Sequence, residues 1–224
     1  VLVDAGDYDP VAQEIETCQG VSRSTRERLA ASAFSHTAHY DGMISNYLTT
    51  DSDDGFPETL NLQFRKHQTM RYGENPHQKA AFYRYTANCE PSVATAEVLN
   101  GKALSYNNIV DIDACLALAK EFAEPFVCVA KHNNPCGAAA AETIELALEQ
   151  AWAGDPVSAF GSVLAFTRPV NLAAAGFLVD GNRFVEAIIA PSFDDDAFEL
   201  LTTKPKWGKN VRLLSLGEFD AAGR

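Results

Sequence analysis

Short apolar runs alternate with segments of helical periodicity along most of the chain. Mostly apolar runs at 126–130, 162–166 and 185–190 have the length of buried strands, and residues 211–216 predict a last one. Apolar residues also recur at helical spacing between and after these strands, at 111–122, 141–153, 171–179 and 194–202. Helices of this length between apolar strands are typical of βαβ units. We therefore expect a three-layer α/β/α fold, with a mainly parallel sheet covered by helices on both faces.

The N-terminal part of the chain follows a different pattern. Residues 1–5, VLVDA, predict a strand, and the capping-box spacing of Ser24 and Glu27 predicts the start of one long helix. Apolar residues follow along that helix at helical intervals, namely Leu29, Ala33, Tyr40, Ile44 and Tyr47. These elements are too few to close a core, so we expect residues 1–48 to be the tail of a domain. The opening Val, in place of Met, leads us to expect that the beginning of the polypeptide is missing.

An acidic stretch punctuated by Gly and Pro, residues 49–57, predicts a linker between that tail and a second domain at 58–224. The alternation of Leu60, Leu62 and Phe64 predicts a strand at the start of this second domain. Residues 79–85 could form another strand.

Composition narrows the classes of function. The chain has 224 residues and a net charge of −12, which argues against a general nucleic-acid or anionic-membrane binder. No apolar run is long enough to span a membrane, and no signal peptide is visible. The five cysteines are scattered without a CxxC pair, so we expect free thiols and a cytoplasmic location.

The segment 127–141, VCVAKHNNPCGAAAA, carries the strongest sign of chemistry. Its buried strand ends in Lys131 and His132, a turn at 133–137 follows, and a helix-forming segment comes next. Ligands and reactive groups of α/β sheets lie at strand ends, so a cation beside an imidazole is a candidate catalytic pair here. The structural alternative is a solvent-facing Lys131, with His132 capping the following helix.

Two other loops carry candidate polar contacts. In MRYGENPHQ, residues 70–78, Arg71 and Tyr72 offer a forked cation and a phenol that suit a phosphate or carboxylate ligand. A polar hairpin or loop explains the same residues. Asn108 closes NGKALSYNN, residues 100–108, where it is either a functional side chain or the N-cap of the next helix.

A glycine and a carboxylate stand out near two further strands. Gly161 ends DPVSAFG, residues 155–161, where the missing side chain either lets a ligand approach backbone N–H groups or simply permits a tight turn. Glu186 is the single carboxylate in FVEAIIAP, residues 184–191. A charge inside an apolar run is costly unless it is paired or faces a ligand, so Glu186 is a candidate binding residue.

Metal chemistry is not expected. Pro135 and Cys136 match half of the PCxxC zinc signature of nucleobase deaminases, but Ala139 stands where the second cysteine should be and no His-x-Glu precedes it. Walker and GxGxxG phosphate-binding loops are also missing. A nucleophilic Cys136 beside His132 is conceivable, but the flanking residues of papain-like enzymes are not present.

Five segments, in their order and spacing, closely resemble the AICAR transformylase/IMP cyclohydrolase family: MRYGENPHQ, NGKALSYNNIVDIDA, VAKHNNPCG, DPVSAFG and FVEAIIAP. The resemblance covers essentially the whole chain. It implies that residues 1–48 are the C-terminal tail of the cyclohydrolase domain. It also implies that residues 58–224 are the first subdomain of the transformylase domain, with a cytidine-deaminase-like fold that uses no zinc.

The resemblance further implies an activity. The family transfers a formyl group from 10-formyltetrahydrofolate, its cosubstrate, to the 5-amino group of the AICAR nucleotide in purine biosynthesis. By resemblance His132 is the general base, Lys131 stabilises the developing oxyanion or assists the departing folate nitrogen, and Asn108 positions the reacting groups. Further positions correspond to the family's AICAR contacts: Arg71, Tyr72, Gly161 and Glu186.

Other parts of the family's pattern are missing from this sequence. The family forms homodimers with active sites between subunits, and its second transformylase subdomain supplies much of the folate site. That subdomain, and most of the cyclohydrolase domain that closes formyl-AICAR to IMP, are expected outside residues 1–224. We therefore expect the catalytic pair with only part of its pocket. The alternative is an inactive fragment that serves as a nucleotide-binding or dimerisation module.

Overall fold

The computed structural model of the chain describes residues 1–50, 56–85 and 90–219. It divides into two units, Val1–Phe64 and Arg65–Arg224, which are treated separately below. The linker expected at 49–57 falls largely outside the described residues, as does Cys89.

The apolar runs of the sequence form the centre of a six-stranded sheet in the second unit. In spatial order its strands are β3 (Glu97–Asn100), β8 (Arg212–Ser215), β7 (Val185–Ala190), β6 (Ser162–Phe166), β4 (Phe126–Lys131) and β5 (Asn134–Ala140). The pairs β6–β7 and β7–β8 are parallel, as expected of βαβ units. The pairs β3–β8, β4–β6 and β4–β5 are antiparallel, so the sheet is mixed.

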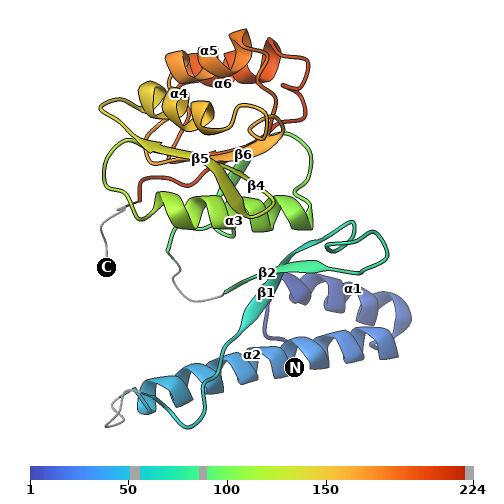
Figure 1. Ribbon diagram of the computed structural model, residues 1–224. Helices are drawn as coiled ribbons and strands as arrows, with labels where there is room; N and C mark the ends of the chain where they lie inside the picture. The colour runs from blue at the N-terminus through green and yellow to red at the C-terminus, as the bar shows by residue number, and fades with distance from the viewer. Residues whose placement is uncertain (51–55, 86–89, 220–224) are drawn as a thin grey trace. The chain divides into compact units, whose positions relative to one another are not determined.

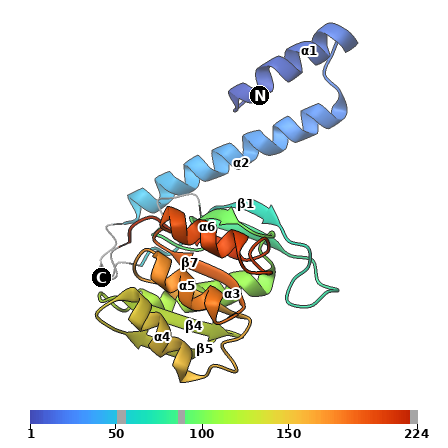
Figure 2. The same cartoon turned by 90° about the horizontal axis from the view of Figure 1, so that it is seen from above.

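Helices cover both faces of this sheet (Figure 1). They are α3 (Tyr106–Ala119), α4 (Ile144–Gly154), α5 (Leu172–Asp180) and α6 (Asp195–Thr203). Seen from above, α4, α5 and α6 lie over the sheet (Figure 2). Because strand side chains alternate between faces, Val127 and Val129 of β4 join the core under these three helices, whereas Phe126 and Cys128 join the core against α3. The three-layer arrangement confirms the expected α/β class.

The segment after the Lys131–His132 pair is a strand, so the turn expected at 133–137 and the helix-forming segment directly after it are wrong, whereas the helix expected at 141–153 is confirmed as α4. Residues Asn134–Ala140 form β5, antiparallel to β4, and α4 begins only at Ile144. Gly137 suits this position because a Cβ there would lie 1.8 Å from the carbonyl O of Ala151 in α4. Tertiary packing thus outweighs the helical preference of the alanine run.

Helices make up most of the described residues of the N-terminal unit, with residues 56–63 outside them. It contains a 3₁₀ turn η1 (Ala5–Asp7), α1 (Tyr8–Cys18) and α2 (Arg23–Leu48). The strand expected at 1–5 is wrong, because Asp4 instead caps η1 by accepting a hydrogen bond from the N–H of Gly6 at 2.8 Å. The long helix is confirmed, but its N-cap is Ser22 rather than Ser24.

The apolar stripe expected along α2 is mostly uncovered. Leu29 is buried, whereas Tyr40, Ile44 and Tyr47 are exposed. None of the helices in the described part of the chain has the length and apolar character needed to cross a membrane.

A separate two-stranded sheet precedes the main one in the second unit. It consists of β1 (Phe64–Thr69) and β2 (Ala81–Tyr85), so the strand expected over residues 60–64 begins only at Phe64. A hydrogen bond from Nε2 of Gln68 to the carbonyl O of Leu104, at 3.2 Å, joins β1 to the segment before α3.

Candidate functional site

The candidate catalytic pair lies at the turn of the β4–β5 hairpin. Lys131, the last residue of β4, is paired with Asn134 of β5, which leaves His132 and Asn133 as the loop. Both loop residues have positive φ, 53° and 63°, the combination that defines a type I′ turn. His132 therefore sits on a tight hairpin, and the alternative that it caps a following helix is wrong.

Hydrogen bonds from side chains hold this turn on two sides. Oδ1 of Asp111, in α3, accepts a bond from the backbone N–H of Asn133 at 2.9 Å. Nδ2 of Asn134 donates to the carbonyl O of His132 at 2.8 Å. Asp111 was not predicted as a site residue from the sequence. Its position one helical turn after Asn108, on the same face of the helix, could have pointed to it. The backbone of the turn is thus fixed, while the His132 side chain is exposed.

Lys131 is anchored beside the amino end of β6. Its Nζ donates a hydrogen bond to the carbonyl O of Phe160 at 2.9 Å. The next residue, Gly161, has a φ of 77°, and its N–H donates to the carbonyl O of Phe184 at 2.8 Å. The N–H of Gly161 is therefore already bonded within the chain, which favours the tight-turn alternative, and contact of Gly161 with the AICAR nucleotide stays a prediction.

Asp155 shapes the loop that ends in Phe160. Its Oδ1 accepts bonds from the N–H groups of Val157 and Ser158, at 3.1 and 3.0 Å, and its Oδ2 accepts from the Ser158 hydroxyl at 2.6 Å. The Ser158 hydroxyl, followed by the Ser158 N–H, lowers the pKa of Asp155 below its ordinary value. The loop that presents a carbonyl to Lys131 is thus built around an ionised carboxylate.

Glu186 of β7 is paired with Arg212 at the start of β8. The Nη1 atom of Arg212 lies 2.7 Å from Oε2 of Glu186, and the side chains are 12% and 40% exposed, respectively. Glu186 was expected either to be paired or to face a ligand. Both are possible together, because the bond to Arg212 uses only Oε2 of the carboxylate. Glu186 also lines a cleft of about 570 Å³, whose other walls include Phe160, Phe184 and Trp207.

These residues gather at one edge of the main sheet. Because β4 runs antiparallel to β6, with Ala130 opposite Val163, the carboxyl end of β4 lies beside the amino end of β6. Because β6, β7 and β8 are parallel, Glu186 and Arg212 lie at the same edge. The candidate residues thus occupy the amino ends of the parallel strands, not the carboxyl ends where open α/β sheets commonly bind ligands.

Asn108 is the third residue of α3 and completes a capping box with the N-cap, Ser105. Oδ1 of Asn108 accepts bonds from the Ser105 N–H at 3.2 Å and the Ser105 hydroxyl at 2.8 Å. The suggestion that Asn108 is itself the N-cap is therefore wrong. Since Oδ1 is bonded to Ser105, a contact with a ligand would use the Nδ2 group.

Arg71 and Tyr72 lie together on the loop that joins β1 to β2. The Arg71 guanidinium carbon is 5.9 Å from the centroid of the Tyr72 ring, which is within the range of a cation–π contact. A backbone bond from Met70 to Ala80, at 3.0 Å, closes the base of the loop. The backbone of this segment is therefore a polar hairpin loop, as one alternative predicted. This conformation is compatible with a ligand contact by the side chains of Arg71 and Tyr72.

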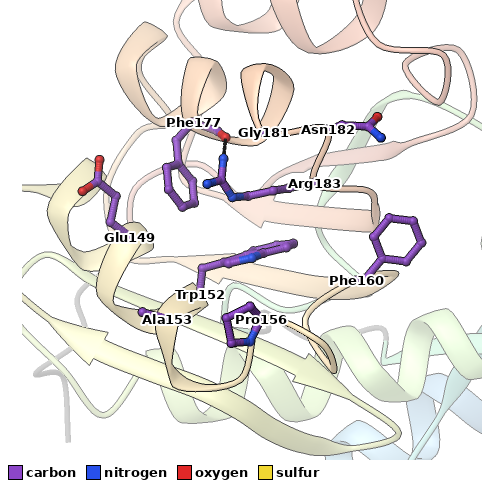
Figure 3. Close-up of a pocket in the computed structure, with 9 residues that line it drawn as sticks. All are labelled: Glu149, Trp152, Ala153, Pro156, Phe160, Phe177, Gly181, Asn182 and Arg183. Carbon is purple, nitrogen blue, oxygen red and sulfur yellow. Dashed lines mark hydrogen bonds between the residues drawn. The ribbon is translucent and has the colours of Figure 1, made fainter.

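A second cleft, of about 530 Å³, lies between α4 and α5 (Figure 3). The Arg183 guanidinium lies over the Phe177 ring, with its carbon 3.7 Å from the ring centroid, and donates to the Phe177 carbonyl O. Trp152 flanks it on the other side in Figure 3. Through these contacts Arg183 forms part of the wall of the second cleft. Phe160 lines both this cleft and the one beside Glu186.

The cysteines near the site are not arranged for nucleophilic chemistry. Sγ of Cys136 donates to the carbonyl O of Val129 at 3.4 Å, and burial raises the pKa of the Cys136 thiol. Burial also raises the pKa of Cys115. A protonated thiol is a weak nucleophile. Across residues 1–50, 56–85 and 90–219, no cluster of His, Cys, Asp and Glu is arranged to hold a metal ion.

Comparison with known proteins gives consistent matches. The family model described as AICARFT/IMPCHase bienzyme matches residues 1–223. The bifunctional purine biosynthesis protein PurH of Rhodopirellula baltica is 47% identical over 218 residues, which are 97% of this chain and 42% of that protein. The PurH proteins of Acidithiobacillus ferrooxidans and Halalkalibacterium halodurans are 49% and 48% identical over 99% and 96% of this chain. The chain spans 41% to 42% of the length of these relatives.

Proposed function

Because the chain belongs to the AICARFT/IMPCHase bienzyme family, we propose that it carries the catalytic pair of the formyltransferase site. The reaction is transfer of the formyl group of 10-formyltetrahydrofolate to the 5-amino group of AICAR. The observation that carries this proposal is the anchored Lys131–His132 turn at the sheet edge that also holds Glu186 and Arg212.

His132 acts as the general base. The 5-amino group of AICAR is a poor nucleophile because its lone pair is delocalised into the ring and the carboxamide. A base that removes its proton as the nitrogen attacks the formyl carbon lowers the barrier. The exposed imidazole on a fixed backbone suits this role, since it can reach a substrate while the turn keeps its position.

Lys131 stabilises the charge on the formyl oxygen in the tetrahedral intermediate. An ammonium group has three N–H donors, and one of them is used by the carbonyl O of Phe160. The other two remain for the oxyanion or for the folate N10 atom, which takes up a proton as its bond to the formyl carbon breaks.

The binding roles fall on groups of matching chemistry. Arg71 is the partner for the AICAR phosphate, because a guanidinium binds phosphate with parallel hydrogen bonds, and Tyr72 lies beside it. Glu186 accepts hydrogen bonds from ribose hydroxyls or ring N–H groups while Arg212 holds its other oxygen. Asn108 donates through Nδ2 to the reacting formyl group.

The proposal extends to domain organisation and assembly. Residues 1–48 correspond to the end of a cyclohydrolase domain, and residues 58–224 to the first, cytidine-deaminase-like subdomain of a transformylase. The enzyme acts in the cytoplasm as a homodimer that shares its active sites, without zinc, and a second subdomain completes the folate site. Ring closure to IMP belongs to the part of the cyclohydrolase domain outside residues 1–48.

A binding module without catalysis is the second candidate function. It is supported by the cleft of about 570 Å³ beside Glu186, which offers space for a nucleotide without requiring formyl transfer. In this case residues 1–224 bind AICAR or dimerise, and they transfer no formyl group.

One assay separates the two functions. Formyl-AICAR production is measured for residues 1–224 and for a chimera, in which these residues replace the matching segment of the Rhodopirellula baltica relative. We expect AICAR binding by both proteins, measured by calorimetry, and turnover by the chimera. Lys131→Ala should lower the kcat of the chimera at least 100-fold with little change in the KM for AICAR. Lys204→Ala, which removes an exposed ion pair with Asp180, is the matched control and should leave kcat unchanged. Equal turnover by the two variants would contradict the proposal.

A further inference from the structure

We propose that Asp111 is a positioning residue that holds the turn on which His132 is presented. This inference rests on the proposed function, because it gives Asp111 a role in a reaction whose general base is His132. Asp111 does not touch the reacting atoms in this role. It acts through the backbone of Asn133.

The turn needs stabilising contacts from outside the hairpin, because its backbone conformation is uncommon for its residues. Type I′ loops require positive φ at both central positions, and Asn-Gly, Asp-Gly and Gly-Gly are the preferred pairs. Here the first position is His132, with a φ of 53°, where an L side chain is less stable than glycine. A histidine in place of the preferred residues weakens the local preference for this turn. Contacts from elsewhere in the fold must then supply the missing stability.

Asp111 is well placed to supply that contact. Its carboxylate accepts the Asn133 N–H at 2.9 Å, and a hydrogen bond to a charged group is stronger than one between neutral groups. The next residue in α3, Ile112, is fully buried in the core shared with β4. The acceptor therefore sits on a helix that is packed against the same strand that leads into the turn.

The same helix links the turn to a second candidate residue. Asn108 precedes Asp111 by three residues, so both lie on one face of α3. The capping box with Ser105 holds the Asn108 side chain in place. In the same way, the Asp111 carboxylate holds the backbone of Asn133. One rigid helix thus sets the position of the proposed base relative to the proposed amide donor.

The first test measures the turn in the full 224-residue chain. Amide hydrogen exchange at Asn133 is compared, by NMR, among the parent chain and the variants Asp111→Ala, Asp111→Asn and Asp113→Ala. Asp113 is an exposed residue of the same helix, which makes it the matched control. We expect Asp111→Ala to speed exchange at Asn133 at least 10-fold, since a bond to a charged acceptor is worth about that factor or more. Asp111→Asn retains an acceptor oxygen and should restore most of the protection.

The second test measures catalysis in the chimera described above. We expect Asp111→Ala to lower kcat about 10- to 100-fold with the KM for AICAR nearly unchanged, because misplacement of a catalytic group costs turnover rather than binding. Asp111→Asn should retain most of the turnover, and the midpoints of its pH–rate profile should match those of the parent. Asp113→Ala should resemble the parent. Thermal melting of each variant checks that the chain stays folded.

The outcomes are decisive. If Asp111→Ala turns over as fast as Asp113→Ala, or Asp111→Asn is as slow as Asp111→Ala, the positioning role is wrong while the proposed function stands. If Asp111→Ala does not fold, the inference is decided by Asp111→Asn, which must then keep the turnover of the parent. If the parent chimera transfers no formyl group while the unmodified relative does, the proposed function fails, and the catalytic role of Asp111 fails with it.

Discussion

Two hairpins of this chain carry candidate site residues, and they are built in opposite ways. The β4–β5 hairpin has a loop of two residues, with His132 in a left-handed conformation and side-chain bonds from Asp111 and Asn134. The β1–β2 hairpin carries Arg71 and Tyr72 on the long loop between Thr69 and Ala81. A proton transfer depends on exact placement of a base, whereas a phosphate can be bound by a long, adaptable side chain. The comparison thus predicts a turnover role for the short hairpin and a binding role for the long one.

The strongest way to break this comparison is to remove the imidazole. We expect His132→Ala and His132→Gly to lower kcat about 10²- to 10⁴-fold, the range typical of a general base. Glycine should also raise the free energy of unfolding by about 1 kcal/mol, because it adopts the positive φ of this position without steric cost. Steady-state kinetics and urea unfolding test the two effects separately. High turnover by His132→Gly would show that the residue serves the turn and not the chemistry.

Removing the cation of the long loop should have a smaller and different effect. We expect Arg71→Ala to raise the KM for AICAR about 10- to 100-fold with kcat nearly retained, since a lost charged hydrogen bond weakens binding of the ground state and transition state alike. Arg71→Lys keeps the charge but not the fork and should fall between the parent and Arg71→Ala. A fall in kcat at constant KM would contradict the division between the hairpins.

Gly137 tests whether helix packing stiffens the short hairpin. A Cβ at Gly137 would lie 1.8 Å from the carbonyl O of Ala151, so we expect Gly137→Ala to lower the free energy of unfolding by about 1–3 kcal/mol. Gly20→Ala is the control, because nothing lies within 4 Å of the added atom. It should be neutral or stabilising by about 0.4–1 kcal/mol. Urea unfolding of both variants gives the comparison, and equal stability would contradict close packing of β5 on α4.

The smallest expected effect is a pH dependence of the loop that meets Lys131. Because bonds from Ser158 lower the pKa of Asp155 from its ordinary 3.8, its carboxylate stabilises the folded loop at pH values above 3.8. That contribution is lost as the pH falls below 3.8 and through the lowered pKa. An NMR titration of the Asp155 carboxyl carbon should show a midpoint below 3.8. A midpoint at or above that value would contradict the bonding pattern of the loop.

The central elements of the fold could be predicted from local pattern. The strand limits expected for β6 and β7 agree with the structure because their runs are mostly apolar, apart from Ser162 and Glu186, and are bounded by turn residues. β5 could not be predicted, since alanines favour helices and only pairing with β4 makes them a strand. The short edge strand β3 was also missed.

The same limit applies to the candidate site: single residues could be predicted from their neighbours in the sequence, but their distant contacts could not. Lys131, Gly161 and Glu186 stood out as single residues in apolar or turn-forming surroundings. Their partners did not, because Phe160 is 29 residues from Lys131 and Arg212 is 26 residues from Glu186 along the chain. Asp111, which holds the turn, is likewise 22 residues from Asn133. Only the antiparallel course of β4 against β6 brings the Lys131 end of β4 to the amino ends of the parallel strands.

The two-residue loop of the β4–β5 hairpin has a consequence for the length of this segment. The strands on either side are in fixed register, with Lys131 opposite Asn134, and alternate side chains of β4 belong to two different cores. One residue inserted or deleted in the loop would break the type I′ geometry or shift the register, and a shift by one residue exchanges the faces of a strand. We therefore expect a one-residue insertion or deletion in this loop to disturb the fold more than a substitution at either loop position.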